Sequence, residues 1–350
     1  MSVAVRPPRA ATAPKPAFLA AARGEPAERR PVWFMRQAGR SLPEYRAVRA
    51  RHSMQEICRT PELAAEVTLQ PVRRLGVDAA ILFGDIMVPL EGAGISVRFE
   101  DGRGPVIDDP IRGPRDVTRL RPLEPDEDVP HVIRTVELLA DELDVPLIGF
   151  AGAPFTLASY LVEGGPSKAQ ARTRALMLAD PATWASLMQR LADSTVAYLA
   201  AQVRAGAEAV QLFDSWAGSL SEADYRRHVL PWVTRVMRGI AGLGVPRVYF
   251  ALGSSHLLPA LREVEAEVLG IDWRTPFPLA RATLGAERVL QGNLDPVALL
   301  AGWREAEART IDVLRGAGDR HVFNLGHGVL PETDPGVLRR VVETVHGWTP

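Results

Sequence analysis

The chain has 350 residues, of which 47% are hydrophobic and 24% are charged, and its formal net charge is −1. This composition is typical of a globular protein with ample material for a core. A nearly neutral chain has no global field that would recruit nucleic acid or an anionic membrane surface, so we expect neither partner. No apolar run reaches the roughly 18 residues that a membrane-spanning helix needs.

The N-terminal residues 1–16 are rich in Ala and Pro and lack the continuous apolar segment of a secretory signal. We predict a disordered tail there, with a transit peptide as the weaker alternative, a single domain over residues 17–350, and a cytoplasmic location.

Short apolar runs alternate with helical patterns along the rest of the chain. Eight such runs begin near Val32, Asp78, Pro146, Glu208, Arg247, Val268, Arg288 and His321. They are too apolar for half-exposed antiparallel strands, and a helical segment separates each from the next, which indicates a parallel sheet covered by helices. Eight βα units in one chain of this length predict an α/β fold, a single (β/α)8 TIM barrel.

Some segments between these runs are less regular. Long helices are predicted over 42–57, 221–243 and 296–315, whereas the region 88–130 is rich in Gly and Pro and predicts an excursion with a short strand near 95–99. A doubly wound open sheet is the alternative architecture. It usually carries a glycine-rich dinucleotide fingerprint after its first strand, and no G-x-G-x-x-G follows Val32–Met35.

The active site of such a barrel forms where the strands end. The polar residues at these positions are, in chain order, Arg36, Arg40, Asp85, Thr156, Tyr160, Asp214, Ser215, Ser254–His256, Asp272, Gln291, Asn293 and His327. Arginine can grip a carboxylate or phosphate with two parallel hydrogen bonds, so Arg36 and Arg40 predict a pocket for an anionic small molecule. Surface ion pairs with neighbours such as Glu44 are the competing interpretation. Asp85 lies among apolar residues and would be a desolvated anion able to stabilise a developing cation.

Several chemistries lack the residues that they need. Lys15 and Lys168 are the two lysines, and Lys15 lies in the tail, so Schiff-base chemistry would depend on Lys168 alone. Cys58 is the single cysteine, and the seven histidines form neither H-x-H nor H-E-x-x-H. We therefore expect no metal site and neither a lysine-dependent aldolase nor a pyridoxal-phosphate enzyme.

Two long motifs resemble those of a known family. Pro31–Tyr45 reads PVWFMRQAGRSLPEY and closely resembles the first signature of the uroporphyrinogen decarboxylase family, and Gly149–Gly164 reads GFAGAPFTLASYLVEG and looks like the second. Four shorter blocks match in the same order: Leu82–Ile86, Leu212–Gly218, Leu290–Pro296 and Asn324–Gly328. The resemblance extends from about Phe18 to the C-terminus.

The resemblance implies a cofactor-independent (β/α)8 barrel enzyme that usually forms a homodimer. Such an enzyme converts the four acetate side chains of uroporphyrinogen III into methyl groups, giving coproporphyrinogen III in haem biosynthesis. Carried over by position, Asp85 would bind the pyrrole N–H groups and stabilise the protonated ring, and Arg36 would be a candidate for handling the proton. The implied substrate-binding residues are Arg36, Gln37, Ala38, Gly39, Arg40, Asp85, Tyr160, Ser215 and His327.

Two positions depart from the family pattern. Ser41 stands where an aromatic residue is common, and Leu252 stands where members often carry a lysine. A related barrel methyltransferase that uses a corrinoid and zinc is an alternative, although its site would draw on His and Cys ligands. A non-catalytic porphyrinogen-binding protein is a second alternative, and it would not need Asp85 together with the arginines.

Overall fold

The computed structural model describes residues 15–100, 102 and 104–349, so most of the predicted tail lies outside the described residues. Seven strands pair in parallel in the order β1-β4-β5-β6-β7-β8-β9. Their bounds are β1 Ala80–Ile81, β4 Leu147–Gly152, β5 Ala209–Asp214, β6 Arg247–Ala251, β7 Val268–Gly270, β8 Val289–Leu294 and β9 His321–Leu325. These strands are buried almost throughout, as a parallel sheet covered by helices requires.

The segment 32–35 closes the ring between the two edge strands. Val32 forms an isolated parallel bridge with Phe323 of β9, and the Trp33 N–H donates to the Phe323 carbonyl at 3.3 Å. On its other side the Val32 carbonyl accepts from the Asp78 N–H at 2.8 Å. The predicted first strand is therefore present as an extended segment rather than a full ladder, and the (β/α)8 barrel is confirmed.

A buried carboxylate fixes this closure at the N-terminal end of the barrel. Asp78, whose side chain is 3% exposed, accepts from the Val32 N–H at 2.8 Å and pairs with Arg29 at 2.8 Å. His346, near the end of the last helix, lies 2.7 Å from the same carboxylate. One side chain thus links the first strand, the second strand and the C-terminal helix.

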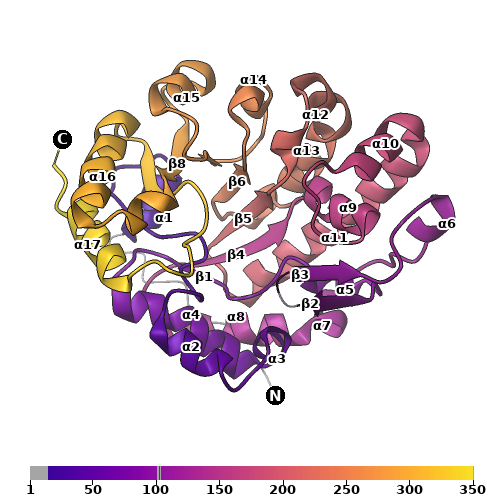
Figure 1. Cartoon of the computed structure of the whole chain (residues 1–350), viewed down its shortest axis with the longest axis horizontal. Coiled ribbons are helices and arrows are strands. Elements are labelled where there is room, and N and C mark those ends of the chain that lie inside the picture. The colour runs from indigo at the N-terminus through magenta and orange to yellow at the C-terminus, as the bar shows by residue number, and fades with distance from the viewer. Residues whose placement is uncertain (1–14, 101, 103, 350) are drawn as a thin grey trace.

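Helices surround the sheet, and α17 packs against α4 so that the first and last parts of the chain meet (Figure 1). The α-helices are α1 Ala17–Ala22, α2 Pro43–Arg49, α3 Met54–Arg59, α4 Pro61–Leu75, α5 Val88–Gly92, α6 Pro114–Val117, α7 Pro125–Asp128, α8 Pro130–Glu142, α9 Pro154–Glu163, α10 Ala171–Ala179, α11 Pro181–Ala205, α12 Glu222–His228, α13 Leu230–Gly239, α14 Leu258–Leu261, α15 Phe277–Leu284, α16 Trp303–Ala317 and α17 Pro335–His346. The 3-10 helices are η1 Ala217–Ser219, η2 Ala241–Leu243, η3 Ser255–Leu257 and η4 Pro296–Leu300. No helix among the described residues is long and apolar enough to cross a membrane.

Three of the predicted helices were wrong in length, because each is divided: 42–57, 221–243 and 296–315. Ser53 starts a new helix, α3, through a capping box with Glu56. Pro231 lies in the first turn of α13, where its missing N–H is tolerated, whereas inside a continuous helix it would break the hydrogen-bond ladder. Gly302, with φ of 93°, separates η4 from α16.

Polar side chains cross the barrel interior beneath the site. The Trp33 indole N–H donates to Gln291 Oε1 at 3.1 Å, and Gln291 Nε2 donates to Gln211 Oε1 at 3.0 Å. All three side chains are buried, so this layer is filled by packed and hydrogen-bonded groups. Gln291, a polar residue near a strand end in the sequence, is therefore used inside the barrel.

The excursion over 88–130 forms a separate layer beside the barrel. β2 (Val97–Glu100) and β3 (Gly104–Ile107) pair as an antiparallel hairpin outside the main sheet (Figure 1). The Ile107 N–H donates to the carbonyl of Gly164, just after α9, at 3.1 Å. The excursion thus contacts the end of a helix that carries a predicted site residue, Tyr160.

Candidate active site

The loop after the first strand carries Arg36 and Arg40 at the C-terminal edge of the barrel. Both residues reach solvent, although protein atoms surround much of the Arg36 guanidinium. Arg36 has φ of 60°, a left-handed conformation that is uncommon for a residue with a Cβ. Its side chain lies against Gly328 in the loop after β9, where a Cβ would come within 2.7 Å of the Arg36 Cγ. The Val329 N–H also donates to the Met35 carbonyl at 2.9 Å, so the last loop of the barrel supports the first.

Gln37, Ala38 and Gly39, which follow Arg36 in this loop, have different roles. The Gln37 side chain is buried, accepts from the Phe34 N–H at 2.9 Å and donates to the Ala79 carbonyl at 2.9 Å. Its amide therefore joins the first two strands, and the Gln37 backbone N–H donates to the Phe34 carbonyl at 3.0 Å, so Gln37 holds the shape of the loop. Ala38 packs against a small apolar cluster, and Gly39 has φ of 125°, which favours glycine.

Replacing Gly328 tests the support of Arg36. We expect Gly328→Ala to displace the Arg36 side chain and raise KM for an anionic substrate about tenfold, because its new methyl group would occupy the space of the Arg36 Cγ. Steady-state kinetics measures this effect. Gly242→Ala is the control, since a Cβ there would meet nothing within 4 Å. Equal KM values for the two variants would contradict the packing argument.

Asp85 lies in the loop after β1 and faces the arginine loop. One carboxylate oxygen accepts from the Met87 N–H at 2.9 Å. Burial raises the pKa of Asp85, whereas the Met87 N–H and the positive charge of Arg36 oppose this rise. A small pocket beside the carboxylate is also lined by Cys58 and Glu91. Asp85 is thus a desolvated acid whose charge depends on nearby donors and cations.

Tyr160, on α9, lies within electrostatic range of both Asp85 and Arg36. Its ring packs against Trp216, with centroids 4.3 Å apart and ring planes 32° apart. Burial and the neighbouring Asp85 raise the pKa of Tyr160 to about 12, against a smaller opposing effect of Arg36. The phenol therefore stays protonated at neutral pH and offers an O–H donor.

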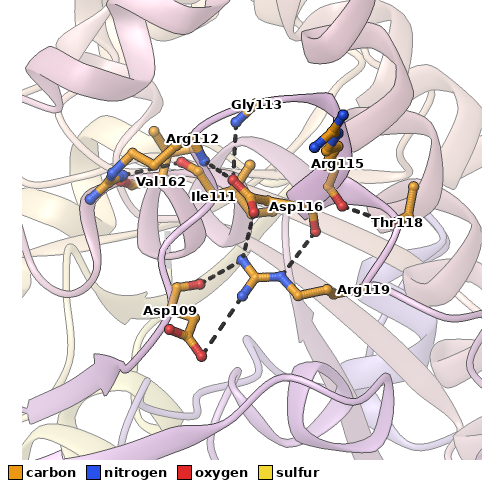
Figure 2. A network of polar contacts seen from close by, with 9 residues as sticks. All are labelled: Asp109, Ile111, Arg112, Gly113, Arg115, Asp116, Thr118, Arg119 and Val162. Atoms are coloured by element: carbon orange, nitrogen blue, oxygen red, sulfur yellow. Dashed lines mark hydrogen bonds and ion pairs between the residues drawn. The ribbon is translucent and has the colours of Figure 1, made fainter.

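The C-terminal half of α9 is held from outside by a polar network (Figure 2). Arg112 donates to the Val162 carbonyl, and the Ile111 N–H donates to the Leu161 carbonyl at 2.8 Å. Asp116 in turn accepts from the Arg112 N–H at 2.8 Å. These contacts fix the helix turn that contains Tyr160 and give the excursion a role in positioning the site.

Asp214, at the end of β5, is fully buried and supports the site rather than facing it. It accepts from the Thr156 hydroxyl at 2.7 Å and from the Tyr249 hydroxyl at 2.8 Å. Thr156 lies one turn before Tyr160, so this bond ties β5 to α9. The next residue, Ser215, is half-buried, and its hydroxyl makes no hydrogen bond with any described residue, so it is available to a ligand.

Burial raises the pKa of Asp214 to about 6, despite its two hydroxyl donors. The folded state therefore holds this proton more tightly than the unfolded state, and stability is lost as pH rises from about 4 to about 6. We expect wild type to lose about 3 kcal/mol of unfolding free energy in this window relative to Asp214→Asn, which has no charge to bury. Urea unfolding across this range measures the difference; parallel stability curves for the two proteins would contradict it.

His327, in the loop after β9, is a neutral donor. Its Nδ1 accepts from the Gly328 N–H at 2.6 Å, so Nε2 carries the proton. Burial, together with the charges of Arg36, Arg274 and Arg40, lowers the pKa of His327 to about 4. The imidazole can therefore donate one hydrogen bond without adding a charge.

The electrostatic interactions place five of the predicted residues around one site: Arg36, Arg40, Asp85, Tyr160 and His327. Sequence reasoning did not assign roles to Trp216, which packs on Tyr160, or to Gly328, which makes room for Arg36. Trp216 lies in the motif LFDSWAG and Gly328 in the motif NLGHG. The sequence therefore identified both motifs but not the residues that pack against them.

Two other features do not belong to this site. An open groove lined by Asp193, Arg235 and Arg238 lies between α11 and α13, in the outer helical layer. Within 15–100, 102 and 104–349, no group of three or more His, Cys, Asp or Glu side chains is arranged to hold a metal ion. The groups that face this site are thus cations, the Asp85 carboxylate and neutral donors. The carboxylates of Asp214 and Asp272, at other strand ends, are buried and hydrogen-bonded within the protein.

The model of the family described as "Uroporphyrinogen decarboxylase (URO-D)" matches residues 13–348. The chain belongs to the uroporphyrinogen decarboxylase family. A protein named uroporphyrinogen decarboxylase from Salinispora tropica is 56% identical over 335 residues, which cover 95% of this chain and 90% of the relative. Another with that name, from Streptomyces coelicolor, is 57% identical over 336 residues, covering 95% and 94%. The predicted family is therefore confirmed, and the chain is a carboxy-lyase.

A solved structure of a methyltransferase from Methanosarcina mazei also resembles this uroporphyrinogen decarboxylase family member. The TM-score is 0.79 with 19% sequence identity, and the match covers 94% of this chain and 96% of that one. At this identity the likeness supports the barrel fold alone. It gives no support to the methyltransferase alternative, whereas the relatives with more than half of their residues identical favour the decarboxylase.

Proposed function

We propose that this uroporphyrinogen decarboxylase family member removes the four acetate carboxyl groups of uroporphyrinogen III, without a cofactor, and releases coproporphyrinogen III. The observation that carries the proposal is that one desolvated carboxylate, Asp85, and the guanidinium of Arg36 lie close enough at the strand ends of the barrel to interact electrostatically. The substrate has the complementary groups, since its pyrrole N–H groups can donate to a carboxylate and its acid side chains can accept from arginine.

The reaction needs an electron sink, which the macrocycle itself provides. A proton adds to the ring carbon next to the acetate-bearing carbon and makes the pyrrole cationic. The electron pair of the bond to the departing CO2 then flows into this cation and leaves an exocyclic methylene. A second proton converts the methylene into a methyl group, and loss of the first proton restores the pyrrole. The net change at each acetate is uptake of one proton and release of one CO2.

Asp85 stabilises the positive charge that develops on the pyrrole ring. Its surroundings are largely dry, so the attraction between carboxylate and cation is stronger there than in water. The pyrrole N–H groups add hydrogen-bond donors to the N–H of Met87, and these donors favour the ionised form of Asp85. Because the cation exists mainly in the transition state and intermediate, this interaction accelerates the reaction rather than merely binding substrate.

Arg36 and Arg40 bind the acid side chains and bring the reacting acetate to the ring. Burial lowers the pKa of Arg36, with a further contribution from the like charge of Arg40. The family resemblance makes Arg36 the candidate for handling the proton. Tyr160, Ser215 and His327 offer neutral hydrogen-bond donors for the remaining carboxylates, together with the backbone of Ala38 and Gly39 in the loop that Gln37 holds in shape. We also propose a homodimer in the cytoplasm, on the strength of the family resemblance.

Anaerobic incubation of the purified protein with uroporphyrinogen III, in the presence of a metal chelator, tests the proposal. We expect coproporphyrinogen III to form at the same rate with and without the chelator, because the site residues supply the charge stabilisation. Activity that is abolished by the chelator and restored by zinc would contradict cofactor independence. Tight binding of the porphyrinogen without release of CO2 would instead favour the non-catalytic binding protein.

A further inference from the structure

We infer that Arg274 is an additional substrate-binding residue that holds a propionate carboxylate of the porphyrinogen at the rim of the site. This inference rests on the proposed function for the identity of the ligand. Arg274 lies in the loop after β7, two residues beyond the buried Asp272. No motif in the sequence assigned it a role.

The guanidinium of Arg274 is held in place from below. Its Cζ atom lies 4.0 Å from the centroid of the Trp273 ring, a cation–π arrangement. The Asp272 carboxylate accepts from the backbone N–H of Arg274 at 2.8 Å, and it lies 3.4 Å from the Nη1 atom of the guanidinium. An arginine that is already ordered loses little side-chain entropy when a ligand binds.

The other donors of this guanidinium are free to meet a ligand. The Arg274 side chain is 52% exposed, whereas its partner Asp272 is fully buried. Nε and Nη2 have no hydrogen-bond partner in the part of the chain that the structure describes. A carboxylate binds best to two parallel N–H groups, and these two atoms offer such a pair.

Arg274 faces the same site as the two arginines of the first loop. Its charge lowers the pKa of His327, together with those of Arg36 and Arg40, so all three guanidinium groups lie within electrostatic range of one imidazole. The ring of Trp273, on which Arg274 rests, lies 6.3 Å from the ring of His327.

The guanidinium of Arg274 also lies near the loop after β6. A Cβ on Gly253 would lie 3.6 Å from Arg274 Nη1, an ordinary contact distance. Leu252, just before Gly253, brings no charge. In the stretches 252–254 and 271–274, which the structure describes in full, the arginine is therefore Arg274.

The exposure of Arg274 indicates which carboxylate it binds. A reacting acetate is attached to a pyrrole ring bound by Asp85, so it must lie inside the site, near Asp85 and Arg36. A half-exposed cation at the rim instead reaches a side chain that points outward and is not consumed. The propionates fit this description, because they persist unchanged from substrate to product. Arg274 should therefore contribute equally to the binding of substrate and of product. Loss of its side chain should raise KM and affect kcat less.

The test compares Arg274→Gln with wild type in two measurements under anaerobic conditions. One is the steady-state KM and kcat for uroporphyrinogen III, and the other is the Kd for coproporphyrinogen III from quenching of tryptophan fluorescence. We expect KM and Kd each to rise about fivefold, as for loss of one partly exposed charged contact. The difference should shrink at high salt, and Arg274→Lys should recover part of it.

Arg340→Gln is the matched control, because the Arg340 guanidinium lies 3.9 Å over the Trp303 ring on the outer helices α16 and α17. It should leave KM and Kd unchanged. If Arg274 merely neutralises Asp272, Arg274→Gln will lower the unfolding free energy while KM and Kd stay at wild-type values, and the inference is wrong. If wild type releases no CO2, the proposed function fails, yet the Kd values for coproporphyrinogen III still decide whether Arg274 binds the porphyrinogen.

Discussion

Asp85→Asn is expected to lower kcat about 10³-fold while the protein stays folded. The variant keeps the size of the side chain and an oxygen that can accept from the Met87 N–H at 2.9 Å, but it removes the negative charge. The carboxylate stabilises a cation that exists mainly in the transition state, so its loss should affect kcat more than KM. Steady-state kinetics with uroporphyrinogen III, together with urea unfolding, measures both effects.

Glu91→Gln is the control for this variant, because Glu91 lines the same small pocket and burial also raises its pKa. It pairs with Arg59 rather than with the arginine loop, at 3.1 Å. We expect kcat within about twofold of wild type. Comparable losses in the two variants would mean that the total negative charge of the region matters and that Asp85 has no specific role.

Arg36→Gln is expected to lower kcat/KM about 10²-fold. The aliphatic part of the Arg36 side chain lies against Gly328, and its charge interacts with both Asp85 and Tyr160. Its removal therefore leaves the substrate carboxylate and Asp85 without a nearby cation. If Arg36 also handles the proton, kcat will fall as well as KM rise. Kinetics over a range of pH separates these contributions.

Arg73→Gln serves as its control, since Arg73 forms an ion pair with Glu142 on the helical surface and both side chains are more than half exposed. Such a pair contributes little, and we expect unchanged kinetics. An Arg36 variant with wild-type kcat/KM would show that Arg36 does not bind substrate. It would favour the competing interpretation, in which the arginines of this loop form surface ion pairs.

The barrel and the main site residues could be predicted because both depend on order along the chain. Parallel strands all end at the same edge, so the residues after the first and second strands, Arg36 and Asp85, had to lie on one face. The same reasoning brought Tyr160 and His327 to that face. The eight apolar runs also corresponded to the strands and the extended segment that close the ring.

Features that depend on contacts between distant loops could not be predicted. Nothing local to Gly328 says that its missing Cβ makes room for Arg36, since the two lie at opposite ends of the sequence. Gln37 was expected in a ligand loop, yet its side chain joins two strands in the interior. Arg274 follows a strand in a stretch without a motif, and its place near His327 depends on how the last loops pack.

The stoichiometry of CO2 release tests the central claim most directly. Metal-depleted protein should release four CO2 for each uroporphyrinogen III consumed anaerobically, with coproporphyrinogen III as the final product, and Asp85→Asn should release almost none in the same time. Quantitative mass spectrometry of the gas, with chromatography of the oxidised porphyrins, provides both numbers. Full CO2 release by Asp85→Asn, or none by wild type until a metal or corrinoid is added, would contradict a site built from one carboxylate and its arginines.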